Sequence, residues 1–364
     1  MLTKYDELLC HQIAATFDSV ETSAREWTER LWFCAHDITG ELILVAGFGF
    51  YPNRNIIDAF ACLAVGGKTQ YNVRASRELR PRIDEVEVGP FSYEVIKPLR
   101  RVRWILADNE HRLSYDIEFE ATMFAHEEEP QLSRFRGRVE ENVKRYFQVG
   151  KPSGWIKVEG KTYHIDKDSW RAERDHSWGT RRGGGVPENG VQPGEIPEGY
   201  LYNMIVVQFD NWGATYHTRE TWEEKSRHFS GGVFYPVESG KAERAITKVE
   251  HNFKFRPDIR QINGGSVVLH VEDGSKIELS MRPLSVCYVK AGGYFGYKGF
   301  THGLWLGHYF NDSVKIDLAD PNAVREVSFL DDVMCEMRCG KEIGYGIVEM
   351  VVVGKYPRYG YQGY

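Results

Sequence analysis

The segment Leu113-Ser114-Tyr115-Asp116-Ile117-Glu118-Phe119-Glu120-Ala121-Thr122-Met123 alternates strictly between two kinds of side chain. Its odd-numbered residues are apolar or aromatic, and the residues between them are polar. Successive side chains of a β-strand point to opposite faces of the sheet, so a period of two predicts a strand with one buried and one solvated face. Such strands are typical of antiparallel sheets. The segment therefore predicts an antiparallel β protein.

Turn residues separate further alternating segments on both sides of this strand. The turn signals are Asp108-Asn109, Glu159-Gly160, Asp273-Gly274 and Thr39-Gly40. Residues of these types join antiparallel strands in hairpins. Hairpins are therefore predicted over residues 102–123, 155–165, 267–281 and 31–50, and later strands over 294–309 and 347–353. No strand–helix–strand alternation accompanies them, which argues against a parallel α/β fold.

One segment near the N-terminus has the period of a helix. Its apolar residues fall on one helical face; they are Leu8, Leu9, Ile13 and Phe17. Thr3, with Asp6 three residues later, has the pattern of an N-terminal cap. We therefore expect a short N-terminal helix over residues 3–17, followed by strands only.

The middle of the chain is rich in glycine and proline. Residues 183–199 include Gly183-Gly184-Gly185 and three prolines and show no periodic apolar pattern. Such a stretch is typical of a linker or of a long loop over a binding site. The lengths on either side each suffice for a closed barrel or a sandwich. The expected domains are therefore residues 1–185 and residues 186–364.

Composition limits the classes of partner. The 364 residues carry a formal net charge of −6, whereas phosphate binding needs clustered lysine and arginine, so a nucleic-acid partner is not expected. No apolar run approaches the ~20 residues of a membrane span, and Lys4, Asp6 and Glu7 stand where a signal peptide would be apolar. The six scattered cysteines fit reduced thiols. We expect a cytoplasmic protein without a membrane span, as a monomer or a homo-oligomer.

The densest group of chemically active side chains lies between Trp170 and Arg181. There Asp175 and His176 are adjacent, and arginines and tryptophans surround them. A carboxylate, an imidazole and an indole together can move protons against the face of a bulky unsaturated or aromatic ligand. In a straight strand, Arg174, His176 and Trp178 point one way, and Glu173, Asp175 and Ser177 point the other.

Two roles follow from this alternation. In the first, Asp175 faces a pocket, burial raises its pKa, and it donates a proton while Trp178 stabilises a cationic transition state. In the second, His176 is the acid/base, Trp178 stacks on the substrate, and Arg174 or Arg181 orients a phenolate or carboxylate. The structural alternative is a corner in which Asp175 pairs with an arginine and the tryptophans fill the interface between domains.

Other residues are candidates on weaker patterns. His217 lies in an alternating segment of the second half and is a second candidate acid/base, with Glu220 on the opposite face as a candidate substrate contact. Further expected substrate contacts are aromatic or amide side chains that need a hydrogen-bond partner when buried; they are Trp170, Tyr51, Asn53 and Tyr146. No metal site and no cofactor are expected, because no ligand constellation or phosphate loop stands out.

The Arg174-Asp175-His176-Ser177-Trp178-Gly179-x-Arg181 element resembles a known family. It is preceded by Tyr146-x-Gln148-x-Gly150 and by Phe33-Cys34-Ala35-His36-Asp37. Together these elements resemble the carotenoid 1,2-hydratase and AttH-like group, which includes the tocopherol-cyclase-like proteins. The resemblance implies an all-β fold of two lipocalin-like antiparallel barrels with a pocket for a large hydrophobic molecule. It also implies cofactor-free acid/base chemistry, such as hydration and cyclisation.

The residues and the resemblance together favour a cofactor-independent lyase or isomerase. Its reaction would be hydration or dehydration, ring opening or closing, or C–C cleavage. Its substrate would be a bulky hydrophobic or oxygenated aromatic small molecule, a class favoured by the aromatic residues and arginines. The alternative is a non-catalytic protein that binds a hydrophobic ligand in the same pocket.

Overall fold

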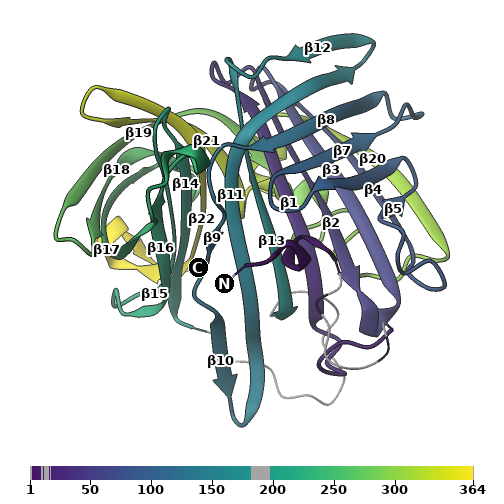
Figure 1. Ribbon diagram of the computed structural model, residues 1–364, viewed down its shortest axis with the longest axis horizontal. Helices are drawn as coiled ribbons and strands as arrows, with labels where there is room; N and C mark the ends of the chain where they lie inside the picture. The colour runs from purple at the N-terminus through teal and green to yellow at the C-terminus, as the bar shows by residue number, and fades with distance from the viewer. Residues whose placement is uncertain (1, 10, 12–15, 17, 182–196, 364) are drawn as a thin grey trace.

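Two curled antiparallel sheets make up most of the protein and lie side by side (Figure 1). The computed structural model describes residues 2–9, 11, 16, 18–181 and 197–363. Neighbouring strands run antiparallel in both sheets. This architecture confirms the predicted all-β class of two lipocalin-like sheets.

The first sheet has fourteen strands and forms a half-barrel. Its main path is β20 (Tyr309–Asp317), β4 (Thr69–Glu78), β3 (Ile56–Val65), β2 (Leu42–Tyr51), β1 (Trp27–Asp37), β13 (Trp170–Thr180), β11 (Arg138–Val158), β8 (Leu113–Ala121), β7 (Arg101–Leu106), β6 (Phe91–Lys97) and β5 (Glu87–Val88). Three short strands pair with β11 beside this path; they are β9 (His126–Glu127), β10 (Gln131–Phe135) and β12 (Lys161–Ile165).

The second sheet has nine strands and closes on itself, because its first strand pairs with its eighth. In order, the strands are β14 (Gly199–Gln208), β15 (Gly213–Thr221), β16 (Ser226–Phe234), β17 (Arg244–Phe255), β18 (Ile262–Val271), β19 (Lys276–Tyr288), β21 (Asp331–Cys339), β22 (Glu342–Tyr356) and β23 (Tyr361–Gln362). The pairing of β14 with β22 leaves the outer faces of these two strands available to pack against the first sheet.

Helical turns are short. The α-helix α1 spans Pro321–Val327, and the 3-10 turns are η1 (Lys4–Glu7), η2 (Pro52–Arg54), η3 (Val237–Ser239), η4 (Val289–Gly292) and η5 (Pro357–Tyr359). None of the helices in the described part of the chain is long and apolar enough to cross a membrane. The described cysteines are free thiols, as expected; they are Cys34, Cys62, Cys287, Cys335 and Cys339.

The predicted hairpins are confirmed at all four turns, where β7 pairs with β8, β11 with β12, β18 with β19, and β1 with β2. The strand predicted over residues 347–353 lies within β22. The strand predicted over 294–309 is wrong, because this stretch is a looped segment. Its four glycines all adopt positive φ angles, a conformation typical of turns; they are Gly296, Gly299, Gly303 and Gly307.

The N-terminal helix is much shorter than expected. Thr3 and Asp6 form the predicted capping box, but the helical backbone is one 3-10 turn and becomes extended at Leu8. Residues 10, 12–15 and 17 of the expected helix lie outside the described residues. The early end of the turn lets Glu7 reach into the first sheet, where it is fully buried.

The C-terminal half of the chain contributes one strand to the first sheet. β20 comes from the C-terminal half and pairs with β4 at the edge of the first sheet. The expected domain boundary between residues 185 and 186 lies outside the described residues and stays a prediction. Between the sheets lies a shared apolar core that includes Trp32 and Phe147 from the first sheet and Met204 and Ile347 from the second. Strands β1, β13, β14 and β22 therefore meet face to face.

Gly179 provides a test of the packing of β13 against β11. Its φ is +127°, and a Cβ atom there would lie 1.9 Å from the Asn142 carbonyl oxygen. Because backbone must move to relieve this contact, we expect Gly179→Ala to lower the free energy of unfolding by about 2–4 kcal/mol.

The matched control is Gly160→Ala. Gly160 also has a positive φ, of +84°, but a Cβ atom there meets nothing within 4 Å. We expect a cost of about 1 kcal/mol from backbone strain alone. Urea unfolding followed by circular dichroism measures both; equal costs would contradict the close approach at Gly179.

Candidate functional site

β13 sorts the side chains of the Trp170–Arg181 stretch onto two faces. It pairs with β1 and β11 without a register shift, so its alternation is regular. Asp175 and Ser177 face the second sheet and line a pocket there. Arg174 and His176 face the interior of the first sheet, where they meet Glu7 and Tyr146. Asp175 and His176 therefore serve different sites.

The inter-sheet pocket lies between the two sheets. It encloses about 420 Å³ of space free of atoms, which includes its open mouth. Its lining is charged and aromatic; the residues are Arg30, Trp32, Arg145, Asp175, Ser177, Arg181, Tyr202, Met204, Tyr294 and Glu349. They come from β1, β11 and β13 of the first sheet, β14 and β22 of the second, and the segments after β13 and η4. The site thus exists only when both sheets are in place.

Asp175 is the predicted catalytic residue that lies in this pocket. Its side chain is 13% exposed, and its Oδ2 lies 3.3 Å from Nε of Arg145. Burial raises the pKa of Asp175, and Glu128 adds to the rise, while Arg145 and Arg181 oppose it. A carboxyl with a raised pKa is a stronger base when ionised and holds its proton to a higher pH.

Glu349 of the second sheet lines the same pocket as Asp175, and Asp332 lies beside it. Asp332 of β21 and Glu349 of β22 are directly opposite in the strand register, and each shifts the pKa of the other. Trp32 Nε1 donates to Asp332 Oδ2 at 3.0 Å, and the Tyr202 hydroxyl donates to Glu349 Oε1 at 2.5 Å. We call Asp332 and Glu349 the carboxyl pair.

Both members of the carboxyl pair have a raised pKa. Burial, followed by the charge of Glu349, raises the pKa of Asp332 well above its usual range. Burial also raises the pKa of Glu349, against the opposing effects of Tyr202 and Arg145. Two close carboxyl groups cannot both ionise cheaply in a buried site. Since Glu349 lines the pocket, a carboxyl group with a raised pKa lies at the pocket wall.

Sequence analysis missed Glu349, although a signal was present. Glu349 interrupts the apolar run Ile347-Val348-Glu349-Met350-Val351-Val352-Val353 in the predicted strand. A carboxylate is rarely buried without a partner, so a lone glutamate inside an apolar strand is a candidate site residue. Arg30 and Arg145 carried no comparable signal, because each lies in a stretch already rich in charge.

Arg174 lies on the inner face of the first sheet and binds the N-terminal segment. Its Nη1 and Nη2 lie 2.5 and 2.7 Å from the two carboxylate oxygens of Glu7. The hydroxyls of Tyr93 and Tyr146 donate to Glu7 Oε1 at 3.1 and 3.0 Å, and the backbone N–H of Leu99 donates to Oε2 at 2.6 Å. Burial alone would raise the pKa of Glu7, but Arg174 outweighs it and the pKa is lowered. This ion pair anchors the N-terminal segment.

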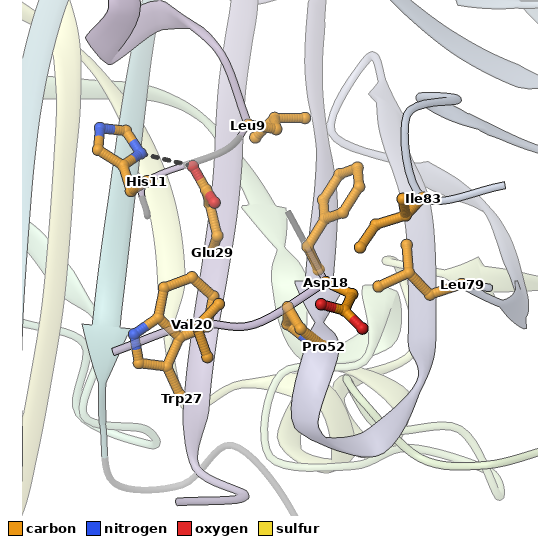
Figure 2. A pocket seen from close by; sticks show the side chains of 10 residues that line it. Leu9, His11, Asp18, Val20, Trp27, Glu29, Pro52, Leu79 and Ile83 are labelled. Atoms are coloured by element: carbon orange, nitrogen blue, oxygen red, sulfur yellow. Dashed lines mark hydrogen bonds and ion pairs between the residues drawn. The ribbon is translucent and has the colours of Figure 1, made fainter. Parts of the chain in front are cut away.

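His176 lies next to this anchor. Nε2 of His176 and Nδ1 of His11 lie 2.8 and 2.7 Å from the same oxygen, Oε1 of Glu29. The imidazole of His11 stacks on Trp178 with ring centroids 3.5 Å apart. His11 and Glu29 also line a second pocket, under the N-terminal segment (Figure 2). The ligand atoms of His11, Glu29 and His176 lie within 4.8 Å of one another, so these residues are of the type and spacing that bind Zn²⁺.

His217 lies in a third place, against Glu128. Nδ1 of His217 is 3.3 Å from Glu128 Oε2, and Nε of Arg219 donates to its Nε2 at 3.3 Å. Burial lowers the pKa of His217 to about 3, so the imidazole is neutral. His228 completes a second set of three metal-ligand atoms within 4.8 Å. The positively charged guanidinium groups of Arg219 and Arg145 adjoin this set and would repel a cation bound there.

The remaining expected contacts lie outside the inter-sheet pocket. Trp170 is buried in the core of the first sheet. The Tyr51 hydroxyl donates to Asp58 at 3.4 Å, and Asn53 holds the backbone carbonyls of residues 22 and 24 at 2.8 Å. Tyr146 belongs to the Glu7 anchor, and Glu220 accepts from the Tyr356 hydroxyl at 2.9 Å inside the second sheet. Of the expected site residues, the structure brings Asp175 and Arg181 together in one pocket.

The Glu7 anchor makes a stability prediction. Glu7→Gln keeps the size of the side chain but leaves the Arg174 guanidinium buried without a counter-charge, which costs about 3–5 kcal/mol. We expect the free energy of unfolding to fall by this amount. The urea unfolding transition should therefore move to a lower urea concentration. Glu21→Gln, at an exposed position, is the control and leaves the transition in place. An unchanged transition in Glu7→Gln would show that the anchor contributes nothing to stability.

Comparisons with known proteins agree with the fold. The AttH protein of Nitrosomonas europaea has a TM-score of 0.53 at 12% identity over 89% of this chain and 92% of its own. CghA, solved with Sch210972, has a TM-score of 0.51 at 10% identity over 90% and 88%. Kievitone hydratase of Nectria haematococca has a TM-score of 0.45 at 11% identity over 88% of each chain.

At these identities the first two similarities show a shared fold. No curated protein sequence matches the chain significantly. A sequence family does match, over residues 2–362. Because this match covers nearly the whole chain, the protein belongs to that family, which is described as Family of unknown function (DUF8625).

Proposed function

We propose that the protein is a cofactor-independent acid/base lyase or isomerase that acts on a small molecule in the inter-sheet pocket. The observation that carries this proposal is the placement of Asp175 and Glu349 on opposite walls of one pocket. Both carboxyl groups have a raised pKa. Elimination, addition of water and ring closure all need one group that gives a proton and one that takes it. Paired carboxyl groups with perturbed pKa values are a common form of such a site.

The surroundings of the two carboxyl groups assign their roles. Glu349 lines the pocket and has a raised pKa, so we assign it as the donor, and Asp332, directly opposite it in the strand register, as the positioning residue. Asp175 adjoins Arg145, whose charge stabilises the ionised form, so it is the acceptor. In a hydration, Glu349 would protonate one carbon of the double bond, while Asp175 would take a proton from the attacking water. The reverse sequence of transfers would give dehydration.

The lining of the pocket favours catalysis over simple ligand carriage. A carrier of hydrophobic ligands needs an apolar pocket with few polar groups. In the inter-sheet pocket, Trp32, Met204 and the tyrosine rings supply apolar contact, but charged side chains make up half of the lining. Part of the enclosed volume is its open mouth, so we propose that a bulky oxygenated substrate inserts its reacting end and leaves its apolar remainder outside. CghA, of the same fold, was solved with a small molecule.

The first test identifies the substrate and the catalytic carboxyls together. Native mass spectrometry of the purified protein identifies any small molecule that remains bound, and that molecule is then incubated with the enzyme. We expect a product that differs by the mass of one water, or an isomer of unchanged mass. Asp175→Asn and Glu349→Gln should each lower the rate by about 10²–10⁴-fold, the usual contribution of a general acid or base.

Asp168→Asn is the control for this test. The Asp168 side chain is 93% exposed, and the residue lies just before β13. It should keep the wild-type rate, and the circular dichroism of all three variants should match the wild type. Wild-type rates in folded Asp175→Asn and Glu349→Gln proteins would refute the proposed site.

The roles of the two carboxyl groups predict a bell-shaped pH dependence. Below the raised pKa of Asp175 the base is protonated, and above the raised pKa of the carboxyl pair the proton donor is lost. The profile of kcat/KM should therefore have an acid limb from Asp175 and an alkaline limb from the carboxyl pair. The residual activity of Glu349→Gln should lack the alkaline limb. An alkaline limb that persists in this variant would assign the donor to another group.

A further inference from the structure

Two arginines in the inter-sheet pocket make no ion pair with any residue that the structure describes. Within the described part of the chain, no carboxylate lies within 4.0 Å of the guanidinium of Arg30 or of Arg181. Arg30 lies over the Tyr294 ring, 4.6 Å from its centroid, and its Nη2 is buried without a hydrogen-bond partner. Arg181 Nη2 donates to the Ser177 hydroxyl at 3.0 Å, but its Nε is also buried without a partner. Both N–H groups are shielded from water, a costly arrangement for a charged donor.

A third arginine adjoins this pair and makes ion pairs with two carboxylates. Arg145 is 10% exposed and lies 3.6 Å from Glu128 and 3.3 Å from Asp175, yet its Nε also has no hydrogen bond of acceptable geometry. Burial, followed by repulsion from Arg145 and Arg30, lowers the pKa of Arg181 to about 10. The three guanidinium groups repel one another across the pocket, and the Asp175 carboxylate, with which all three interact, offsets part of this repulsion. Such a cluster is stable in a buried place when an anion lies between its members.

The geometry points to a subsite in which Arg30 and Arg181 bind an anionic oxygen of the substrate, a carboxylate or a phenolate. This inference rests on the proposed function, because it takes the inter-sheet pocket as the substrate site. It adds that the substrate carries a negative charge. The planar guanidinium presents N–H groups in a fork that matches a carboxylate, and the Ser177 hydroxyl adds a further donor. Tyr294, whose ring lies against Arg30, lines the same pocket.

The subsite also has a consequence for the reaction. An anionic group held by Arg30 and Arg181 fixes the substrate relative to Asp175 and Glu349, which line the same pocket. If the anion is a phenolate or an enolate conjugated with the reacting carbon, the guanidinium groups also stabilise negative charge that develops there. Arg30 and Arg181 are thus expected to bind and orient, while the carboxyl groups transfer the protons.

The test uses two probes of the same shape and different charge. Benzoate and benzamide are titrated into the full-length protein by isothermal calorimetry at low salt. We expect benzoate to bind at least about tenfold more tightly than benzamide, because charged hydrogen bonds are about twice as strong as neutral ones. Arg30→Gln and Arg181→Gln should each remove about tenfold of the benzoate affinity and leave benzamide binding unchanged.

Two controls separate this role from a structural one. Arg82→Gln removes an exposed arginine that is paired with Glu85 and should bind both probes like the wild type. The thermal midpoint of Arg181→Gln should not fall, because Arg145 and Arg30 repel this buried guanidinium and its pKa is lowered. Benzoate should raise the midpoint of the wild type more than that of either variant.

The outcomes distinguish the inference from the proposed function. Equal affinity for benzoate and benzamide, absence of binding of either probe, or unchanged benzoate affinity in both arginine variants would each overturn the anion subsite. Such a result leaves the proposed function standing if Asp175→Asn and Glu349→Gln still lose turnover of the co-purified molecule. Selective benzoate binding that depends on Arg30 and Arg181, with turnover unaffected in the carboxyl variants, would keep the subsite and refute the proposed catalysis.

Discussion

The regular pairing of β13 between β1 and β11 is the constraint on which the rest of the structure depends. Because the strand has no bulge between residues 170 and 180, its side chains alternate strictly between two compartments. Arg174 and His176 are used inside the first sheet to hold the N-terminal segment through Glu7 and Glu29. Asp175 is left to the space between the sheets. One short motif therefore builds both an anchor and a pocket.

Burial then gives the pocket its chemistry. The second sheet covers Asp175 and places Glu349 in the same pocket, with Asp332 beside Glu349. All three carboxyl groups are thus removed from water. Removal from water disfavours the charged state and raises the pKa of each carboxyl. The same enclosure leaves Nη2 of Arg30 and Nε of Arg181 buried without a hydrogen-bond partner. The raised pKa values of the carboxyl groups and the arginine N–H groups without partners thus both result from the packing of the two sheets.

The features that depend on residues close together in the sequence could be predicted. Alternation and turn chemistry located the strands around Leu113–Met123 and the hairpins, and alternation also separated Asp175 from His176. The pocket could not be predicted in full, because Arg30, Tyr202 and Glu349 come from distant strands that only the packing of the two sheets brings together. His176 and Arg174 have the residue types of a catalytic site, and no local signal reveals that Glu7 and Glu29 already satisfy them.

The account depends most directly on a proton held by the carboxyl pair at neutral pH. Infrared difference spectroscopy of the unliganded protein measures it without any substrate, by comparing the wild type with Glu349→Gln and Asp332→Asn at pH values on either side of neutrality. The account predicts a carbonyl band of a protonated carboxyl in the wild type at neutral pH, shifted or lost in both variants. A wild-type spectrum at neutral pH with ionised carboxylate bands alone would contradict it.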